Sequence, residues 1–216
     1  MTTPSRVFPA LAAAALVLAG AGPAATLDWA IGAEGGYSEM TNAEKSAKAI
    51  FDRSKGGGTI GGFLRLGLGQ SFFLEAHGRH FERTGERVFV AENNGEVFRL
   101  GHPLTIRLIP VYGAVGYRFL PNSHFAPYVT IGVGATAYKE TSDVAGLIET
   151  QSTTKVSGHG ALGVDYFAGP LRLGVEVGYS TVPNTIGESG VSKLYGEKDV
   201  GGLTVLARLA FGSRAP

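Results

Sequence analysis

Apolar residues alternate with small or polar residues over much of the chain. Residues 171–180 (LRLGVEVGYS) are the clearest case, with Leu173 and Val175 on one parity and Arg172 and Glu176 on the other. Successive side chains of a β-strand point to opposite faces, so this pattern predicts a strand with one apolar and one polar face. Eight such strands are predicted, at residues 27–37, 59–68, 72–81, 104–119, 128–138, 156–167, 171–180 and 202–211.

The connections between these segments alternate in length. Short turns such as residues 69–71 and 168–170 serve one end of the strands. The other end carries long polar stretches, at residues 38–58, 82–103, 139–155 and 181–201. No long helical pattern separates the strands, so consecutive strands are expected to pair in an antiparallel sheet. An even number of strands with long loops at one end is typical of an up-and-down barrel.

Charged residues of the predicted strands have the parity opposite to the apolar residues. Arginines are matched by carboxylates among small residues, whereas all seven lysines fall in the long connections. Arginine can bond a carboxylate through two nitrogens, and an unpaired buried charge is costly, so this composition favours a cramped interior. Asp28, His77 and His159 share that parity. The predicted interior charge network is Glu34, Arg65, Glu75, Arg79, Arg118, Asp165, Arg172, Glu176 and Arg208.

The opposite face is apolar along the strands and carries aromatic residues near their ends. Two belts of aromatic residues mark the two interfaces of a membrane. The predicted girdle is Trp29, Tyr117, Phe119, Tyr128, Tyr166, Tyr179 and Phe211. Together the two faces predict an all-β fold, an eight-stranded antiparallel up-and-down transmembrane β-barrel with long external loops. The alternative is a lipocalin-like soluble barrel, whose apolar face would line the lumen.

One strand interrupts the alternation. In residues 104–119, Leu104 and Ile106 share one parity, whereas Val111 and Val115 share the other. Proline removes a donor from the hydrogen-bond ladder and is tolerated at bulges, so we expect a bulge near Pro110 that keeps Arg107 from facing lipid.

The N-terminus has the pattern of an export signal. Arg6 precedes the apolar residues 7–20, and small residues follow. Because the apolar run is shorter than the roughly 20 residues of a membrane-spanning helix, we expect a cleaved signal peptide at residues 1–25 and a barrel at residues 26–216. A buried N-terminal helix is the alternative.

Charge and composition exclude several classes of protein. The formal net charge is +1 and the chain has no cysteine. A nucleic-acid binder would show a basic face, and a disulfide framework or a cysteine metal site needs cysteine. No histidine pair has the spacing of metal ligands on one strand face, so neither a metal nor a cofactor is expected.

Residues 109–138 (IPVYGAVGYRFLPNSHFAPYVTIGVGATAY), with residues 161–179 and 203–211, resemble the outer-membrane β-barrel family of OmpA- and OmpX-type proteins. The resemblance implies a monomer in the outer membrane of a Gram-negative bacterium, surrounded by lipid and lipopolysaccharide. It also implies insertion by the barrel-assembly machinery, which reads a final aromatic residue. Here Phe211 is followed by GSRAP, whereas the family usually ends at the aromatic.

Specific activity is expected in the long loops. In residues 41–54, Thr41 and Glu44 have the spacing of a capping box, and Ala47 and Phe51 lie on one helical face, which predicts a short helix over the barrel mouth or one that binds a partner. Asn94-Gly95 predicts a hairpin in which the third and fourth strands protrude. Such a ribbon edge could bind an extended peptide.

We therefore expect a barrel with a plugged, charge-paired interior, which acts structurally or binds an extracellular protein through its loops in an adhesin-like role. A narrow porin-like channel for small solutes is the alternative. A lipid A-modifying enzyme is disfavoured because His80, on the apolar parity near the outer rim, lacks a neighbouring His-x-Ser pattern, and no catalytic residue is assigned.

Overall fold

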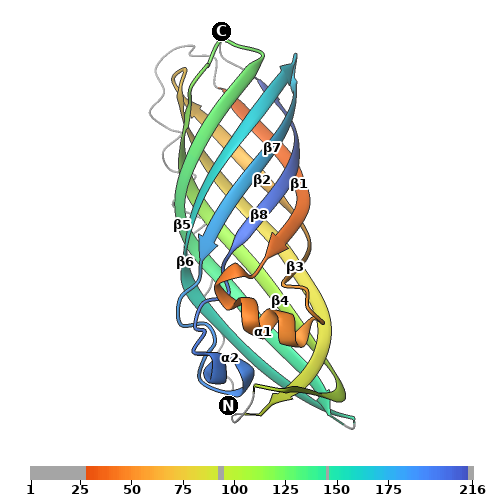
Figure 1. Ribbon diagram of the computed structural model, residues 1–216. Coiled ribbons are helices and arrows are strands. Elements are labelled where there is room, and N and C mark those ends of the chain that lie inside the picture. The colour runs from red at the N-terminus through yellow and green to blue at the C-terminus, as the bar shows by residue number, and fades with distance from the viewer. Residues whose placement is uncertain (1–27, 92–94, 145, 214–216) are drawn as a thin grey trace, which may run out of the picture.

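Eight antiparallel strands form a closed barrel in the computed structural model, which describes residues 28–91, 95–144 and 146–213 (Figure 1). Each strand pairs with the next, and β8 pairs with β1 from Trp29↔Ser213 to Ser38↔Thr204. This confirms the predicted fold. The expected signal peptide lies outside the described residues. The strands are β1 Trp29–Glu39, β2 Gly56–Leu68, β3 Phe72–Val90, β4 Val97–Arg118, β5 Phe125–Val144, β6 Leu147–Ala168, β7 Leu171–Thr181 and β8 Leu203–Ser213.

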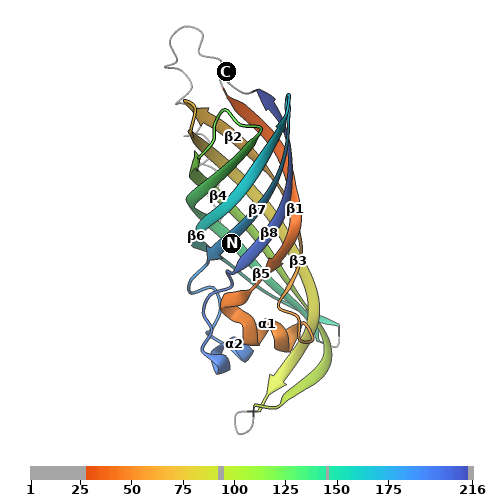
Figure 2. The same ribbon diagram turned by 45° about the horizontal axis from the view of Figure 1, so that its top comes forward.

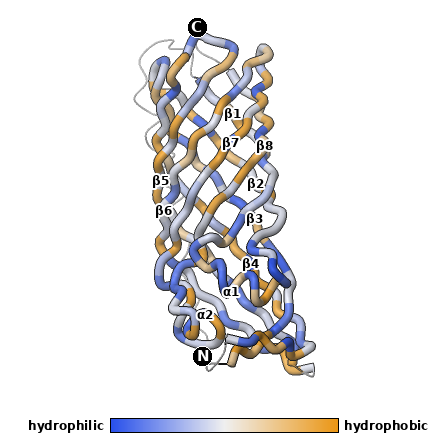
Figure 3. The backbone as a smooth tube through the Cα atoms, in the orientation of Figure 1, coloured by the Kyte–Doolittle hydropathy of each residue, from blue (hydrophilic) through white to orange (hydrophobic). Residues whose placement is uncertain are grey.

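The two faces of β7 show how the barrel wall is oriented. Leu173 and Val175 are 52% and 56% exposed, whereas Arg172 and Glu176 are 4% and 1% exposed. The apolar side chains therefore point away from the barrel axis and the charged ones point toward it, the reverse of a soluble barrel with an apolar lumen. Exposed and buried residues alternate in the same way along β8 and the first part of β3. Hydrophobic and hydrophilic residues are interspersed along the strands of the barrel (Figure 3).

Four strands are longer than predicted. Residues 139–155 were expected to be a loop, and residues 82–103 a long connection with a protruding hairpin; β3 and β4 pair as far as Val90↔Val97, and β5 and β6 as far as Val144↔Leu147. The extension of β5 and β6 is mostly polar on both faces, so its sequence lacks the alternation that marks a strand in the wall. The protruding ribbon of β3 and β4 is as predicted, although Asn94 of its turn lies outside the described residues.

The extension of β3–β6 beyond the barrel, residues 82–90, 97–107, 139–144 and 147–152, is called the wing below. It projects past the barrel mouth on the same side as the two helices (Figure 2). Its base is marked on the outer face by charged side chains of β3, β4 and β5. Arg107 Nε donates to Glu82 Oε2 at 2.5 Å, and Lys139 pairs with Arg107 in the β4–β5 register.

The expected bulge near Pro110 is wrong. The β4–β5 register runs without a shift from Leu104↔Ser142 to Arg118↔Tyr128, and the shift in β3–β4 lies instead between Glu86 and Val88. Arg107 consequently faces outward, in the charged ring at the base of the wing. Leu104 and Ile106 point inward, whereas Val111 and Val115 of the same strand point outward. The reason is that Leu104 and Ile106 lie at the barrel mouth, where the inner face is apolar.

Two short helices lie at the mouth: α1 Glu44–Ile50, preceded by the 3-10 turn Thr41–Ala43, and α2 Gly190–Tyr195. Within the described residues, no helix is long and apolar enough to cross a membrane. The short helix predicted within residues 41–54 is present as α1. Its residues join strand residues in one apolar cluster, called the lid: Met40, Ala43, Ala47, Phe51, Phe81, Ile106, Tyr138, Val182 and Val200.

The predicted capping box is wrong. The 3-10 turn delays the start of α1, so Ala43 occupies the N-cap position and no side chain there accepts a hydrogen bond. Thr41 Oγ1 has no hydrogen-bond partner among the described residues. Glu197 caps the helix instead: its carboxylate accepts hydrogen bonds from the backbone N–H groups of Lys45 and Ser46, each at 2.9 Å.

Candidate functional site

The structure places all nine residues of the predicted charge network, together with Asp28, inside the barrel, and none is more than 7% exposed. Five arginines and five carboxylates share this space. Glycines on the facing strands leave room for the long side chains. A Cβ on Gly174, for example, would lie 2.7 Å from the Asp165 carboxylate. The sequence left open which acid pairs with which arginine, and the structure divides them into two groups.

The larger group is centred on Arg208. Its Nη1 lies 2.5 Å from Glu176 Oε2, its Nη2 lies 2.9 Å from Glu75 Oε1, and its Nε lies 3.3 Å from Glu34 Oε2. Arg79 links Glu34, at 2.6 Å, to Glu176, at 3.2 Å. Buried ions are tolerated only with such close partners, because each loses its hydration on burial.

Arg65 completes the larger group. Its Nε donates to Glu75 Oε2 at 2.8 Å, and its Nη1 is bonded to Asp165. Its guanidinium also lies 4.1 Å from the centre of the Phe73 ring, a cation–π contact. The larger group therefore contains three arginines and four carboxylates.

The smaller group lies near the short-turn end and contains two arginines with one carboxylate. Asp28 lies 3.1 Å from Arg118 Nη1 and 2.5 Å from Arg172 Nη2. Arg172 Nη2 also donates to the backbone oxygens of Trp29, at 3.2 Å, and Ser213, at 2.5 Å. Arg172 therefore ties the seam between β1 and β8 to the interior.

The placement of Tyr128 in the aromatic girdle is wrong. It has the parity opposite to the outward Val129 and is only 1% exposed. Its phenol oxygen donates to Glu176 Oε2 at 2.9 Å and accepts a hydrogen bond from Arg208 Nη1 at 2.8 Å. The ring fits inside because Gly163, across from it, has no side chain. Tyr128 is thus part of the interior network.

The other girdle residues lie on the outer face. Trp29 and Phe211 contact edge to face at 6.2 Å, and Tyr117 and Phe119 do so at 5.2 Å. Tyr166 is exposed at the same end, and Tyr179 is exposed at the loop end. Tyr138 has the same inward parity as Tyr128 and is buried in the lid.

Three aromatic side chains stack inside the barrel below the lid. The His77 and His159 rings lie 4.8 Å apart between centres, and the Tyr112 and His159 rings 5.0 Å apart. His80 faces outward, with its Nε2 3.9 Å from Glu82. Within the described residues, no group of three or more histidine, cysteine, aspartate or glutamate residues could hold a metal ion.

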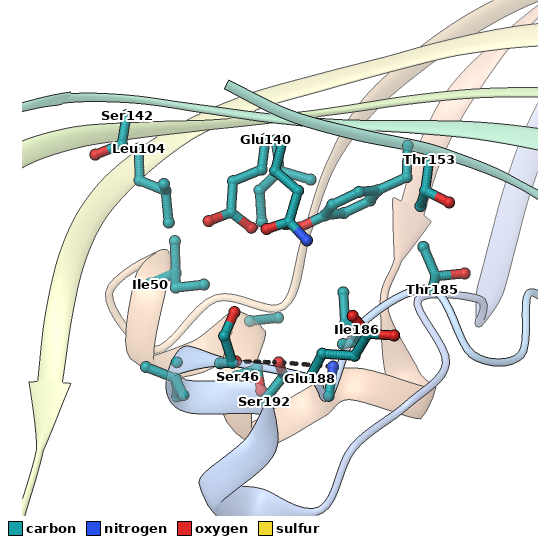
Figure 4. A pocket seen from close by; sticks show the side chains of 18 of the residues that line it. Ser46, Ile50, Leu104, Glu140, Ser142, Thr153, Thr185, Ile186, Glu188 and Ser192 are labelled. Atoms are coloured by element: carbon teal, nitrogen blue, oxygen red, sulfur yellow. Dashed lines mark hydrogen bonds between the residues drawn. The ribbon is translucent and has the colours of Figure 1, made fainter. Parts of the chain in front are cut away.

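A cavity of about 420 Å³ opens between the inner face of the wing and the two helices (Figure 4). Glu140 and Ser142 line it from β5, Ile50 from α1, and Ile186 and Glu188 from the segment before α2. It is called the loop cavity below. Sequence reasoning missed it because its walls come from segments far apart in the chain, and no local motif marks them.

One carboxylate of the loop cavity is held by the lid. Tyr138 donates its hydroxyl hydrogen to Glu140 Oε2 at 2.5 Å. The Glu140 side chain is thereby oriented at the wall of the cavity.

Comparison with known proteins agrees with this architecture. The model of the outer membrane protein beta-barrel domain family matches residues 10–202. Among solved structures, Neisserial surface protein A (NspA) superposes with a TM-score of 0.53 at 14% identity, covering 87% of this chain and 96% of that one.

A major outer membrane protein from Thermus thermophilus gives a TM-score of 0.53 at 13% identity, covering 86% of this chain and 100% of that one. At these identities the likeness is one of fold. Among curated proteins, none matches this sequence.

Proposed function

This chain belongs to the outer membrane protein beta-barrel domain family, and from that premise we propose that it is a closed, non-conducting barrel that presents its wing and loops as a binding surface. The barrel would act as a rigid support in the membrane, and recognition would take place at the loop end. The observation that carries the proposal is the charge-paired filling of the lumen.

Two layers support a closed lumen. The lid packs α1 and both ends of the connection between β7 and β8 against the inner wall at the mouth. Below it, the arginines and carboxylates of the larger group span the barrel from β1, β2, β3, β6, β7 and β8. The cavity between these layers has a volume of about 50 Å³, enough for one or two water molecules but not for a hydrated solute.

Recordings from purified protein in planar lipid bilayers test this proposal. We expect no discrete conductance steps from the wild-type barrel. Arg208→Ala with Tyr128→Ala, which removes the central cation and the ring beside it, is the variant in which conductance steps are expected. Regular steps from the wild type would support the narrow porin-like channel instead.

The wing supports a role at the cell surface. Beyond the charged side chains at its base it exposes large apolar side chains, including the paired rings of Phe89 and Phe98 on the β3–β4 ribbon and Leu147 and Ile148 on β6. Large apolar side chains left exposed on such a surface favour contact with another protein. We propose an extracellular protein as the partner, in an adhesin-like role, and no enzymatic activity.

Membership of the family supports an outer-membrane setting for the proposal. We propose a monomer in the outer membrane of a Gram-negative bacterium, exported with a cleaved signal peptide, inserted by the barrel-assembly machinery and in contact with lipid and lipopolysaccharide. Protease treatment of intact cells tests the orientation, because cleavage at Arg87 or Arg99 requires the wing to face outward. Unchanged lipid A in cells that express the protein would agree with the absence of lipid A chemistry.

A further inference from the structure

We propose that the loop cavity binds a small amphiphilic amine, with its ammonium group between Glu140 and Glu188 and its hydrocarbon part on the apolar floor. This inference deepens the proposed surface function, on which it rests for access from outside the cell. It concerns a free small molecule and does not require the protein partner proposed for the wing.

The size and lining of the cavity suit such a ligand. A volume of about 420 Å³ lies within the range of about 300–1,000 Å³ typical of small-molecule sites. Apolar side chains from α1, the lid, β4 and the segment before α2 line it: Met40, Ala47, Ile50, Leu104, Ile106 and Ile186. These provide a surface for a short alkyl or aryl group, whose transfer from water is favourable.

The charges of the lining favour a cation. Glu140 and Glu188 lie on opposite sides of the cavity, on β5 and on the segment before α2 (Figure 4). Within the described residues neither has an ion-pair partner. Arg87 is engaged by Glu149 at 2.8 Å, which leaves Lys155 as the remaining cation of the lining. Two carboxylates against one ammonium leave one negative charge for a ligand to neutralise.

A buried hydroxyl adds a third acceptor. Ser142 lines the cavity, is only 4% exposed, and its Oγ has no hydrogen-bond partner among the described residues. A buried polar atom without a partner is costly, and a ligand that bonds to it recovers that cost. An alkylammonium carries three N–H donors, which matches two carboxylates and one hydroxyl.

The experiment uses the full barrel in lipid nanodiscs, with n-hexylammonium as the probe and n-hexanol and hexanoate as matched probes that change only the head group. Binding is measured by titration calorimetry. We expect hexylammonium to bind at least tenfold more tightly than hexanol, and hexanoate to bind most weakly.

Glu140→Gln with Glu188→Gln should weaken hexylammonium binding by about tenfold or more, because each charge-assisted hydrogen bond is lost, while hexanol binding stays unchanged. Glu82→Gln is the control, since it removes an exposed carboxylate on the outer face of the wing. Heat-modified migration on gels verifies that each variant is folded.

Equal affinity for hexylammonium and hexanol, or unchanged hexylammonium binding in the double glutamine variant, would overturn the inference. Neither result bears on bilayer conductance or on protease access to the wing in intact cells. Failure of the cavity proposal is therefore distinct from failure of the proposed surface function.

Discussion

Glu197 bonds twice to Ser46 across the barrel mouth, although 151 residues separate them in the chain: its Oε2 accepts hydrogen bonds from the Ser46 backbone N–H at 2.9 Å and from the hydroxyl at 2.5 Å. The first N–H groups of a helix lack partners within the helix, and negative charge near them is favourable. This one carboxylate therefore fastens the segment between β7 and β8 to α1, and with it one wall of the loop cavity.

Glu197→Ala should loosen α1 without unfolding the barrel. Loss of a capping acceptor costs about 1 kcal/mol of local stability. We expect faster tryptic cleavage at Lys45 and Lys48 in the folded protein, measured on gels over time. Glu188→Ala is the matched control, because Glu188 lies in the same connection but does not bond to α1. Equal cleavage rates in the two variants would contradict the capping role.

The two-to-one pairing at Asp28 predicts an order of stabilities. Asp28→Asn leaves Arg118 and Arg172 without their carboxylate and should lower the free energy of unfolding by about 3–5 kcal/mol. Arg172→Leu should cost less, because Asp28 keeps Arg118. The double variant should fall between the two single variants. Urea unfolding in lipid vesicles measures all three, and equal losses for the single variants would argue against shared pairing.

Gly116 of β4 tests how tightly the lumen is filled, and Gly113 on the outer face of the same strand provides the comparison. A Cβ on Gly116 would collide with the Phe73 ring, whereas a Cβ on Gly113 would meet no atom within 4 Å. Gly116→Ala should therefore destabilise the barrel by about 1–3 kcal/mol through overpacking, and Gly113→Ala should be close to neutral. The temperature at which each variant loses its folded gel mobility provides the comparison. A neutral Gly116→Ala would show that the lumen has spare room.

The orientation of the wall predicts where a charge is tolerated on the outer face. Val175 lies near the middle of β7 and faces outward, so Val175→Arg should cost about 2–4 kcal/mol in a bilayer. Leu147→Arg, at the tip of the wing, should cost little because that position meets water. Refolding yield and urea unfolding in vesicles give both values. A tolerated Val175→Arg would place this face in water.

Much of the barrel could be predicted because each strand records its own two faces. In residues 171–180 the parity of Leu173 against Arg172 decides which side chains share a face, and that relation depends only on the backbone. The placement of arginine and glutamate on the small-residue face then indicates a narrow interior. The strand order followed from the absence of long helical segments between the strands, which lets consecutive strands pair.

The errors occur where distant residues decide the outcome. The parity of Tyr128 already points inward, but its ring can be accommodated only because Gly163 on the next strand leaves space and because Glu176 and Arg208 bond its hydroxyl. The β5–β6 part of the wing was missed because residues 139–155 are mostly polar on both faces, so their strand pairing has no apolar alternation to reveal it.

The sequence by itself thus determined the strand faces, the strand order and the inward position of the charges, since alternation is a local property of an extended chain. Only the tertiary structure decided the choice of ion-pair partners, the capping of α1 by Glu197 and the loop cavity. Each of these depends on closure of the ring, which brings together side chains from strands and loops that no local pattern relates.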